Sequence, residues 1–344
     1  MRCAFERAAN ALPNATVERN LRFADHPVRF RVVGTTLGSA LREPFGHLQA
    51  GDGAVESPAL TIEVWDAAET GVPGPPAMPV DDGWLTWPLD DGVLSASPDG
   101  MFVRFQGPRS ATWLDLTTGS LVGWRADGRD LTLSERAKPL SHFLHRWYAS
   151  RGVQLVHAGL VELHGRGVLV GGPRGAGKST TALACLAGGF RYLADDHCGL
   201  QSDPEGGFTG HSLFDCARVQ PEHLPRFAAE IRDAVRHDGT AADKALLFLA
   251  ARFPDRIQPK ARIHAVVLPR VVGGHCQVRP ASAAQALLRL APSSLLMVLG
   301  PGAGGLERLS ELAQHVPAFW LDLGDDLDAV PGLVSAVLQS VSAT

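Results

Sequence analysis

A glycine-rich run in the middle of the chain carries the clearest chemical signal. Residues 172–179 match the pattern G-x-x-x-x-G-K-[ST], in which glycines let the backbone approach an anion closely. Backbone N–H groups of such a loop, with the positive end of the helix that follows, bind phosphate oxygens. The run therefore predicts a phosphate-binding loop made of Gly172, Pro173, Arg174, Gly175, Ala176, Gly177, Lys178, Ser179 and the adjoining Thr180.

The flanking sequence supports this interpretation. An apolar run at 167–171 predicts a strand before the loop, and residues 180–187 are good helix formers after it. In this context the Lys178 side chain is expected to reach the β- and γ-phosphates of a nucleoside triphosphate, and the Ser179 hydroxyl to bind Mg²⁺. The sequence therefore predicts ATP and Mg²⁺ as cofactors.

A pair of carboxylates, Asp195 and Asp196, follows the next predicted strand at 190–194. The carboxyl end of a strand in such a sheet lies beside the phosphate loop. One carboxylate could hold Mg²⁺ or its water, while the other accepts a proton from an attacking hydroxyl. The residues alone equally allow a single metal-binding aspartate with a solvated neighbour.

Composition limits the classes of function. The chain has 344 residues, 45% of them apolar, and a net charge of −4. This predicts two domains and no cationic surface for nucleic acid. The five cysteines form no C-x-x-C pair, so we expect neither a zinc site nor a disulfide framework. The sequence has no signal-peptide pattern and no apolar run of about 18 residues, so we expect a cytoplasmic protein without membrane contact.

The elements that position the candidate site residues belong to a chain with two halves of different sequence pattern. Residues 1–137 contain many short runs of alternating apolar and polar residues split by Gly, Pro and Asp, which predicts a mostly β accessory or substrate-docking domain. Residues 138–344 begin with a helix at 139–150 and then alternate strands and helices, which is typical of an α/β catalytic domain. Further helices are expected at 221–235, 242–252, 282–290, 306–315 and 327–338, and strands at 263–268 and 318–323.

Residues 152–200 resemble the catalytic core of HPr kinase/phosphorylase. The resemblance lies in a histidine before small residues (His157), a predicted β-hairpin, the phosphate loop, a helix, and a strand ending in Ala-Asp-Asp. The spacings also resemble the family: 21 residues separate His157 from Lys178, and 18 separate Lys178 from Asp196. The resemblance implies a P-loop kinase domain of the HPr-kinase/PEP-carboxykinase-like type.

The resemblance also implies a role for each matched residue. Asp196 matches the aspartate that takes the proton from an acceptor serine. His157 matches a histidine near the transferred phosphoryl group, with a purely structural strand histidine as the alternative. Lys178 matches the phosphate-binding lysine and Ser179 the Mg²⁺ ligand, and Asp195 is expected to be a second metal ligand or a structural carboxylate.

This sequence departs from the family pattern in several places. Thr180 stands where the family has an acidic residue, and Glu222 is a candidate for the family's metal-binding glutamate without the surrounding glycine-rich motif. Arg262, just before a predicted strand, is the nearest match to the family's catalytic arginine, with Lys244 and Arg218 as alternative cations. These departures disfavour both HPr itself as the substrate and the reverse, phosphorolytic reaction.

The sequence is more similar to the divergent HPr-kinase-like proteins that accompany ribosomally made peptides, including lasso peptides. That similarity implies an ATP-dependent kinase that phosphorylates a serine hydroxyl of a peptide or protein, and it suggests assembly as a homo-oligomer. The alternatives are a nucleotide-binding regulator without phosphotransfer and a small-molecule kinase. Asp196 favours a kinase over a regulator, because a nucleotide switch needs no proton acceptor.

Overall fold

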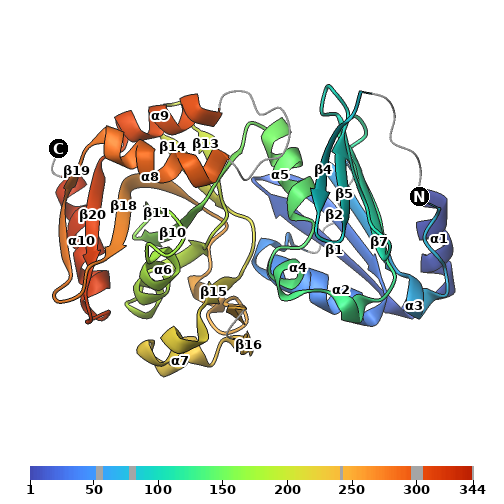
Figure 1. Cartoon of the computed structure of the whole chain (residues 1–344), viewed down its shortest axis with the longest axis horizontal. Coiled ribbons are helices and arrows are strands. Elements are labelled where there is room, and N and C mark those ends of the chain that lie inside the picture. The colour runs from blue at the N-terminus through green and yellow to red at the C-terminus, as the bar shows by residue number, and fades with distance from the viewer. Residues whose placement is uncertain (52–56, 77–82, 241–242, 296–304, 343–344) are drawn as a thin grey trace. The chain divides into compact units, whose positions relative to one another are not determined.

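The protein is described by a computed structural model over residues 1–51, 57–76, 83–240, 243–295 and 305–342. It has a mixed α/β structure that divides into two compact units, Met1–Ser150 (unit 1) and Arg151–Thr344 (unit 2) (Figure 1). Within these described ranges, no helix has both the length and the apolar character needed to span a membrane. Each unit has its own sheet and is considered by itself below.

Unit 1 is built on an eight-stranded sheet in the order β1-β2-β3-β8-β7-β6-β5-β4. The strands pair antiparallel except for β3, which runs parallel to both β2 and β8. The strands are β1 (Thr16–Phe23), β2 (His26–Val33), β3 (Leu60–Asp66), β4 (Leu85–Leu89), β5 (Gly92–Ala96), β6 (Phe102–Gln106), β7 (Ser110–Asp115) and β8 (Ser120–Arg125). The helices are α1 (Arg2–Ala11), α2 (Thr35–Arg42), α3 (Ala67–Thr70), α4 (Leu133–Ala137) and α5 (Ser141–Ser150), with short 3₁₀ turns η1 (Pro13–Ala15), η2 (Glu43–Leu48) and η3 (Gly128–Asp130).

Helix α5 lies in unit 1, which corrects the boundary expected after residue 137. Its buried Trp147 and Tyr148 pack against Phe23 of β1, with ring centroids 6.1 and 5.9 Å away. Burial of large aromatic surface is the main stabilising term at such a contact. The division between the units therefore falls after Ser150, at the C-terminal end of this helix.

Unit 2 contains a nine-stranded sheet with a parallel centre. Strand β18 (Lys260–Val271) runs parallel to β11 (Arg166–Gly171) on one side and to β20 (Ala318–Leu323) on the other. The middles of β11 and β18 are continuous apolar runs buried on both faces, as parallel strands require. The remaining strands are β9 (Gln154–Val156), β10 (Ala158–Leu163), β12 (Arg191–Ala194), β13 (Cys198–Ser202), β14 (Phe208–Ser212) and β19 (Gln277–Ala281).

Helices cover both faces of this sheet and enclose two apolar cores. Helices α6 (Lys178–Ala187) and α10 (Ala329–Ser342) enclose one core, and α8 (Ala283–Leu295) and α9 (Gly305–His315), side by side in Figure 1, enclose the other. These helices agree with the expected helical segments after the glycine-rich loop and near the C-terminal end of the sequence. Together they leave the carboxyl ends of β11, β18 and β20 at one edge of the sheet.

A small three-stranded sheet replaces two expected helices. It consists of β15 (Ala217–Val219), β17 (Ala245–Leu247) and β16 (Val235–His237), in that order. The prediction of a helix at 221–235 is wrong, because that segment forms the 3₁₀ turn η4 (Pro221–Arg226), the short α7 (Ala229–Arg232) and β16. The prediction at 242–252 is also wrong, because fully buried residues 245–247 pair with both neighbouring strands, and this tertiary pairing overrides helix propensity.

Candidate active site

The glycine-rich loop lies at the carboxyl end of β11 and leads directly into α6. Gly175 and Gly177 have φ of 82° and 102°, in the left-handed region that favours glycine. A Cβ atom on Gly177 would lie 2.3 Å from Cδ1 of Leu323 at the end of β20. The loop can therefore take this path only with glycine at position 177, against the neighbouring strand.

The Lys178 side chain curls back into the loop that precedes it. Its Nζ atom donates hydrogen bonds to the carbonyl oxygens of Gly172 at 2.8 Å and Pro173 at 3.1 Å. Burial lowers the pKa of this ammonium group, and the carboxylates of Asp195 and Asp196 oppose that shift. A cation is thus held at the centre of the loop, at the N-terminal end of a helix, where an anion would also meet the helix dipole.

Ser179 and Asp195 form a direct contact beside the lysine. The Ser179 hydroxyl donates to Oδ1 of Asp195 at 2.9 Å, and the backbone N–H of Arg218 donates to Oδ2 at 3.4 Å. Asp195 is 6% exposed. Burial, together with the nearby charge of Asp196, raises the pKa of the Asp195 carboxyl.

Asp196 makes a close contact with His157. His157 Nε2 lies 2.6 Å from Oδ1 of Asp196, whose side chain is 34% exposed. Asp196 has φ of 69°, an uncommon conformation for a residue with a side chain, and such strain is often found at functional sites. The His157 backbone N–H donates to the Ser294 hydroxyl of α8, so the histidine is fixed between β9 and β10.

These residues line one cavity of about 440 Å³ in unit 2. Its lining includes five cationic side chains against three carboxylates, so the cavity carries excess positive charge suited to a polyanion. The five cations come from the glycine-rich loop, α6, β15, η4 and the segment just before β17. Two of the carboxylates follow β12, and the third precedes β17. The charged residues are Arg174, Lys178, Arg218, Arg226, Lys244, Asp195, Asp196 and Asp243.

The expected metal ligands are only partly brought together. Ser179 and Asp195 offer two adjacent oxygen donors, which fits Mg²⁺, an ion that usually takes one or two carboxylates, phosphate oxygens and water. Glu222 does not join them: it is exposed on η4 and lies outside the lining, although Gln220 and His223 belong to it. Among the residues that the structure describes, no group of three or more His, Cys, Asp or Glu side chains could hold a metal.

Arg262 is also absent from the cavity, contrary to its expected catalytic position. It lies near the start of β18, and its Nη2 donates to the Gly206 carbonyl at 2.9 Å. Because β18 runs parallel to β11, the start of β18 lies at the sheet edge opposite the loop. Arg218 and Lys244, the alternative cations, do line the cavity.

Arg226, like His223 and Asp243, lines the cavity but was not identified from the sequence. It lies in η4, a segment expected to be part of a regular helix, and lines the cavity with the neighbouring His223. The proline at position 225 was a signal against an uninterrupted helix there. Nothing in the sequence indicated that this arginine would line the same cavity as the glycine-rich loop.

Comparison with known proteins gives local sequence matches. Over 83 residues the chain is 37% identical to HPr kinase/phosphorylase of Levilactobacillus brevis and 39% identical to that of Streptococcus thermophilus; each match covers 24% of this chain and 26% of the relative. The chain thus spans about a quarter of the length of the curated relatives it matches. The solved Hpr(Ser) kinase/phosphatase from Coxiella burnetii aligns with 55% of this chain and 97% of its own, at 14% identity and a TM-score of 0.31. No protein-family model matches the chain.

Proposed function

We propose that this chain, a divergent relative of the HPr kinase/phosphorylases, is an ATP-dependent kinase that phosphorylates a serine hydroxyl of a peptide or protein. One observation carries the proposal: a single cavity contains both a phosphate-binding loop and a partly exposed carboxylate held by a histidine. The loop supplies the donor side of a phosphoryl transfer. The carboxylate supplies the acceptor side.

On the donor side, the backbone N–H groups of the loop and the start of α6 bind the phosphates. Lys178 contributes its ammonium group at the β- and γ-phosphates, exchanging its bonds to the Gly172 and Pro173 carbonyls for phosphate oxygens. Ser179 and Asp195 would hold Mg²⁺, which neutralises charge on the phosphates when it is bound. The raised pKa of Asp195 reflects a buried carboxylate that a cation would stabilise in its charged form.

On the acceptor side, Asp196 is the proton acceptor. As the serine oxygen bonds to the γ-phosphorus, its proton passes to the Asp196 carboxylate, and the bond from that phosphorus to the bridging oxygen of ADP breaks. His157, 2.6 Å from Oδ1, keeps the carboxylate oriented for this transfer. The exposed third of the Asp196 side chain leaves it accessible to a hydroxyl from outside the cavity.

Arg218 and Lys244 take the role expected of Arg262. The backbone N–H of Arg218 donates a hydrogen bond to Asp195, and its guanidinium donates one to Asp243 at 2.9 Å. The buried Nε atom of Arg218 has no hydrogen-bond partner among the described residues. Lys244 lies close enough to lower the pKa values of both Asp195 and Lys178. The two cations would stabilise negative charge on the transferring phosphoryl group.

The acceptor hydroxyl belongs to a peptide or protein in this proposal, and the local sequence match to HPr kinase/phosphorylases supports that choice. In its specific form, the proposal is that the acceptor is a ribosomal precursor peptide of the lasso type and that this chain acts in the cytoplasm as a homo-oligomer. The second candidate function is a nucleotide-binding regulator that transfers no phosphoryl group, because such a regulator would also need a phosphate-binding loop and a bound metal. Asp196 and His157 distinguish the two, since a regulator has no use for a proton acceptor.

The proposal is tested by transfer of phosphate from ATP labelled on its γ-phosphate to degenerate peptides with one central serine. The wild-type chain should label serine in a Mg²⁺-dependent reaction. Lys178→Ala should abolish both this labelling and the thermal stabilisation by Mg-ATP. Arg262→Ala, a matched loss of one cation outside the cavity, should retain both. Undiminished ATP stabilisation of Lys178→Ala would show that the nucleotide binds elsewhere.

A further inference from the structure

A second cavity, of about 520 Å³, lies within unit 1. It is bounded by one face of the eight-stranded sheet, by α2 and α4, and by the segment that leads into α5. Its volume is in the range of about 300–1,000 Å³ found for ligand pockets. None of its lining residues has a part in the proposed phosphoryl transfer.

The floor of this cavity is apolar. It is lined by four buried side chains: Leu37 and Leu41 of α2, Val64 of β3 and Leu131 after η3. Phe105 of β6 contributes an aromatic ring that is only partly covered. A group that filled this space would remove apolar surface from water, so the floor favours an apolar occupant.

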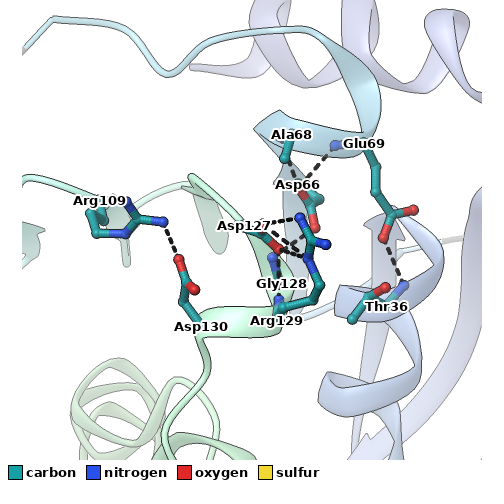
Figure 2. Close-up of polar contacts among 9 residues, drawn as sticks. All are labelled: Thr36, Asp66, Ala68, Glu69, Arg109, Asp127, Gly128, Arg129 and Asp130. Carbon is teal, nitrogen blue, oxygen red and sulfur yellow. Dashed lines mark hydrogen bonds and ion pairs between the residues drawn. The ribbon is translucent and has the colours of Figure 1, made fainter.

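One wall of the cavity, formed by α2 and η3, is held in place by a buried carboxylate and a partly buried one. Figure 2 shows Asp66, at the end of β3, accepting from the backbone N–H groups of Ala68 and Glu69; its other oxygen accepts from Gly128 N–H at 2.8 Å. Glu69 accepts in turn from the N–H groups that begin α2, including that of Thr36 at 2.9 Å. Because Asp66 is fully buried, these bonds hold α2 and η3 firmly against the sheet.

The opposite wall is fixed by α4. Arg125 of β8 forms an ion pair with Glu135 of α4, and Glu135 also completes a capping box with Thr132 at the start of that helix. Both walls are therefore held by contacts within unit 1. These contacts pre-organise the cavity, which reduces the cost of binding a ligand.

The mouth of the cavity is acidic. Asp90 and Asp91, in the turn between β4 and β5, line it and are exposed. His142 also lines the cavity, and Asp91 lies close enough for its negative charge to act on the pKa of this histidine. Glu135 forms an ion pair with Arg125, and Lys138 is the other cation of the lining, so three carboxylates face two cations and the lining has a net negative charge.

The sequence of unit 1 as a whole also has a net negative charge. Residues 1–150 carry 18 Asp and Glu against 14 Lys and Arg, whereas residues 151–344 carry 18 of each. Residues 51–100 alone carry ten acidic residues and no Lys or Arg. The whole net negative charge of the chain thus belongs to unit 1, and this favours a positively charged partner.

We propose that the unit 1 cavity binds a segment of the acceptor peptide or protein that has apolar side chains next to Arg or Lys. The apolar side chains occupy the floor formed by Leu37, Leu41 and Phe105, and the cationic group lies at Asp90 and Asp91. The word acceptor rests on the function proposed above. The binding itself needs neither ATP nor Lys178.

The test uses three short fluorescein-labelled peptides without nucleotide: Gly-Phe-Leu-Arg-Arg-Gly, its charge-reversed form Gly-Phe-Leu-Glu-Glu-Gly, and its polar form Gly-Ser-Ser-Arg-Arg-Gly. Fluorescence anisotropy with the full chain should show saturable binding of the first peptide only. Replacing both aspartates, Asp90→Asn with Asp91→Asn, should weaken it about fivefold, an effect that added salt should reduce. Ser134→Trp, from an exposed position on the cavity wall, should fill the space and abolish binding.

Two controls separate this proposal from the kinase assignment. Glu18→Gln removes an exposed carboxylate of β1 outside the cavity and should leave the affinity unchanged. Lys178→Ala should also bind the peptide normally, so a failure of the kinase assignment leaves this result intact. Equal binding of the three peptides, no saturable binding, or full affinity in Ser134→Trp with native circular dichroism would each overturn the proposal.

Discussion

At the scale of single residues, the site depends on charged groups taken out of water. Asp195 is buried beside Asp196, so its carboxyl binds a proton more readily in the folded chain than in the unfolded chain, where the ordinary pKa is 3.8. At pH values above the pKa of Asp195 in the folded chain, folding buries a negatively charged carboxylate, and this penalty lowers the free energy of unfolding. As the pH falls below that value the folded chain takes up a proton, and the penalty shrinks until the unfolded chain is protonated as well.

We therefore predict that Asp195→Asn stabilises the protein at neutral pH in the absence of Mg²⁺, while weakening the Mg²⁺ dependence of ATP binding. The amide still accepts the Ser179 hydroxyl bond but carries no charge. The gain over the wild type should shrink as the pH falls toward about 4, and urea unfolding across a pH series measures it. The matched control is Asp243→Asn, at a side chain that is 43% exposed. A variant less stable than wild type at neutral pH would contradict this account.

At the scale of elements, the loop between β11 and α6 is shaped by the strand next to it. We predict that Gly177→Ala destabilises the protein more than Gly175→Ala and abolishes ATP binding. Both positions have positive φ, which costs a residue with a side chain about 1–2 kcal/mol. Only at position 177 would the new Cβ also meet Leu323, whereas at position 175 it meets no atom within 4 Å.

Urea unfolding of the two variants measures this difference, because both share the backbone strain and only one has the clash. The clash should add roughly 1–3 kcal/mol. Equal destabilisation of the two variants would mean that contact with β20 does not shape the loop. Retained ATP binding in Gly177→Ala would mean that the loop can bind phosphate along another path.

Element spacing also explains which site residues could be predicted. His157, Ser179, Asp195 and Asp196 meet because each lies at the end of a short strand or the start of a helix that strong local patterns indicate. The prediction that Arg262 belongs to the site is wrong because β18 pairs parallel to β11. A residue near the start of β18 therefore lies at the sheet edge opposite the glycine-rich loop. Arg218, Arg226 and Lys244 depend on the small sheet, whose pairing is long-range and leaves no local pattern in the sequence.

At the scale of the whole molecule, the two units have separate sheets and separate apolar cores. The texture of the sequence indicated two domains but placed their boundary before α5 instead of after it, because the sequence alone does not identify the packing partner of this amphipathic helix. Its contacts with Phe23 assign it to unit 1. All the residues that line the cavity beside the glycine-rich loop belong to unit 2.

We predict that residues 151–344 fold alone and bind Mg-ATP with an affinity close to that of the full chain. The full nine-stranded sheet and both of its cores lie within this fragment. Thermal unfolding with and without Mg-ATP provides the measurement, with Lys178→Ala in the fragment as the control for specific binding. A fragment that folds but gains no stability from Mg-ATP would show that unit 1 contributes to the nucleotide site.

The central claim is that this molecule transfers a phosphoryl group and that Asp196 accepts the proton. It is tested most directly by Asp196→Asn, which preserves the shape of the side chain but cannot take the proton. With degenerate serine peptides and γ-labelled ATP, this variant should bind Mg-ATP as the wild type does and label serine roughly 10²–10⁴-fold more slowly. Labelling at the wild-type rate, or no labelling by the wild type itself, would contradict the kinase mechanism and favour a nucleotide-binding regulator.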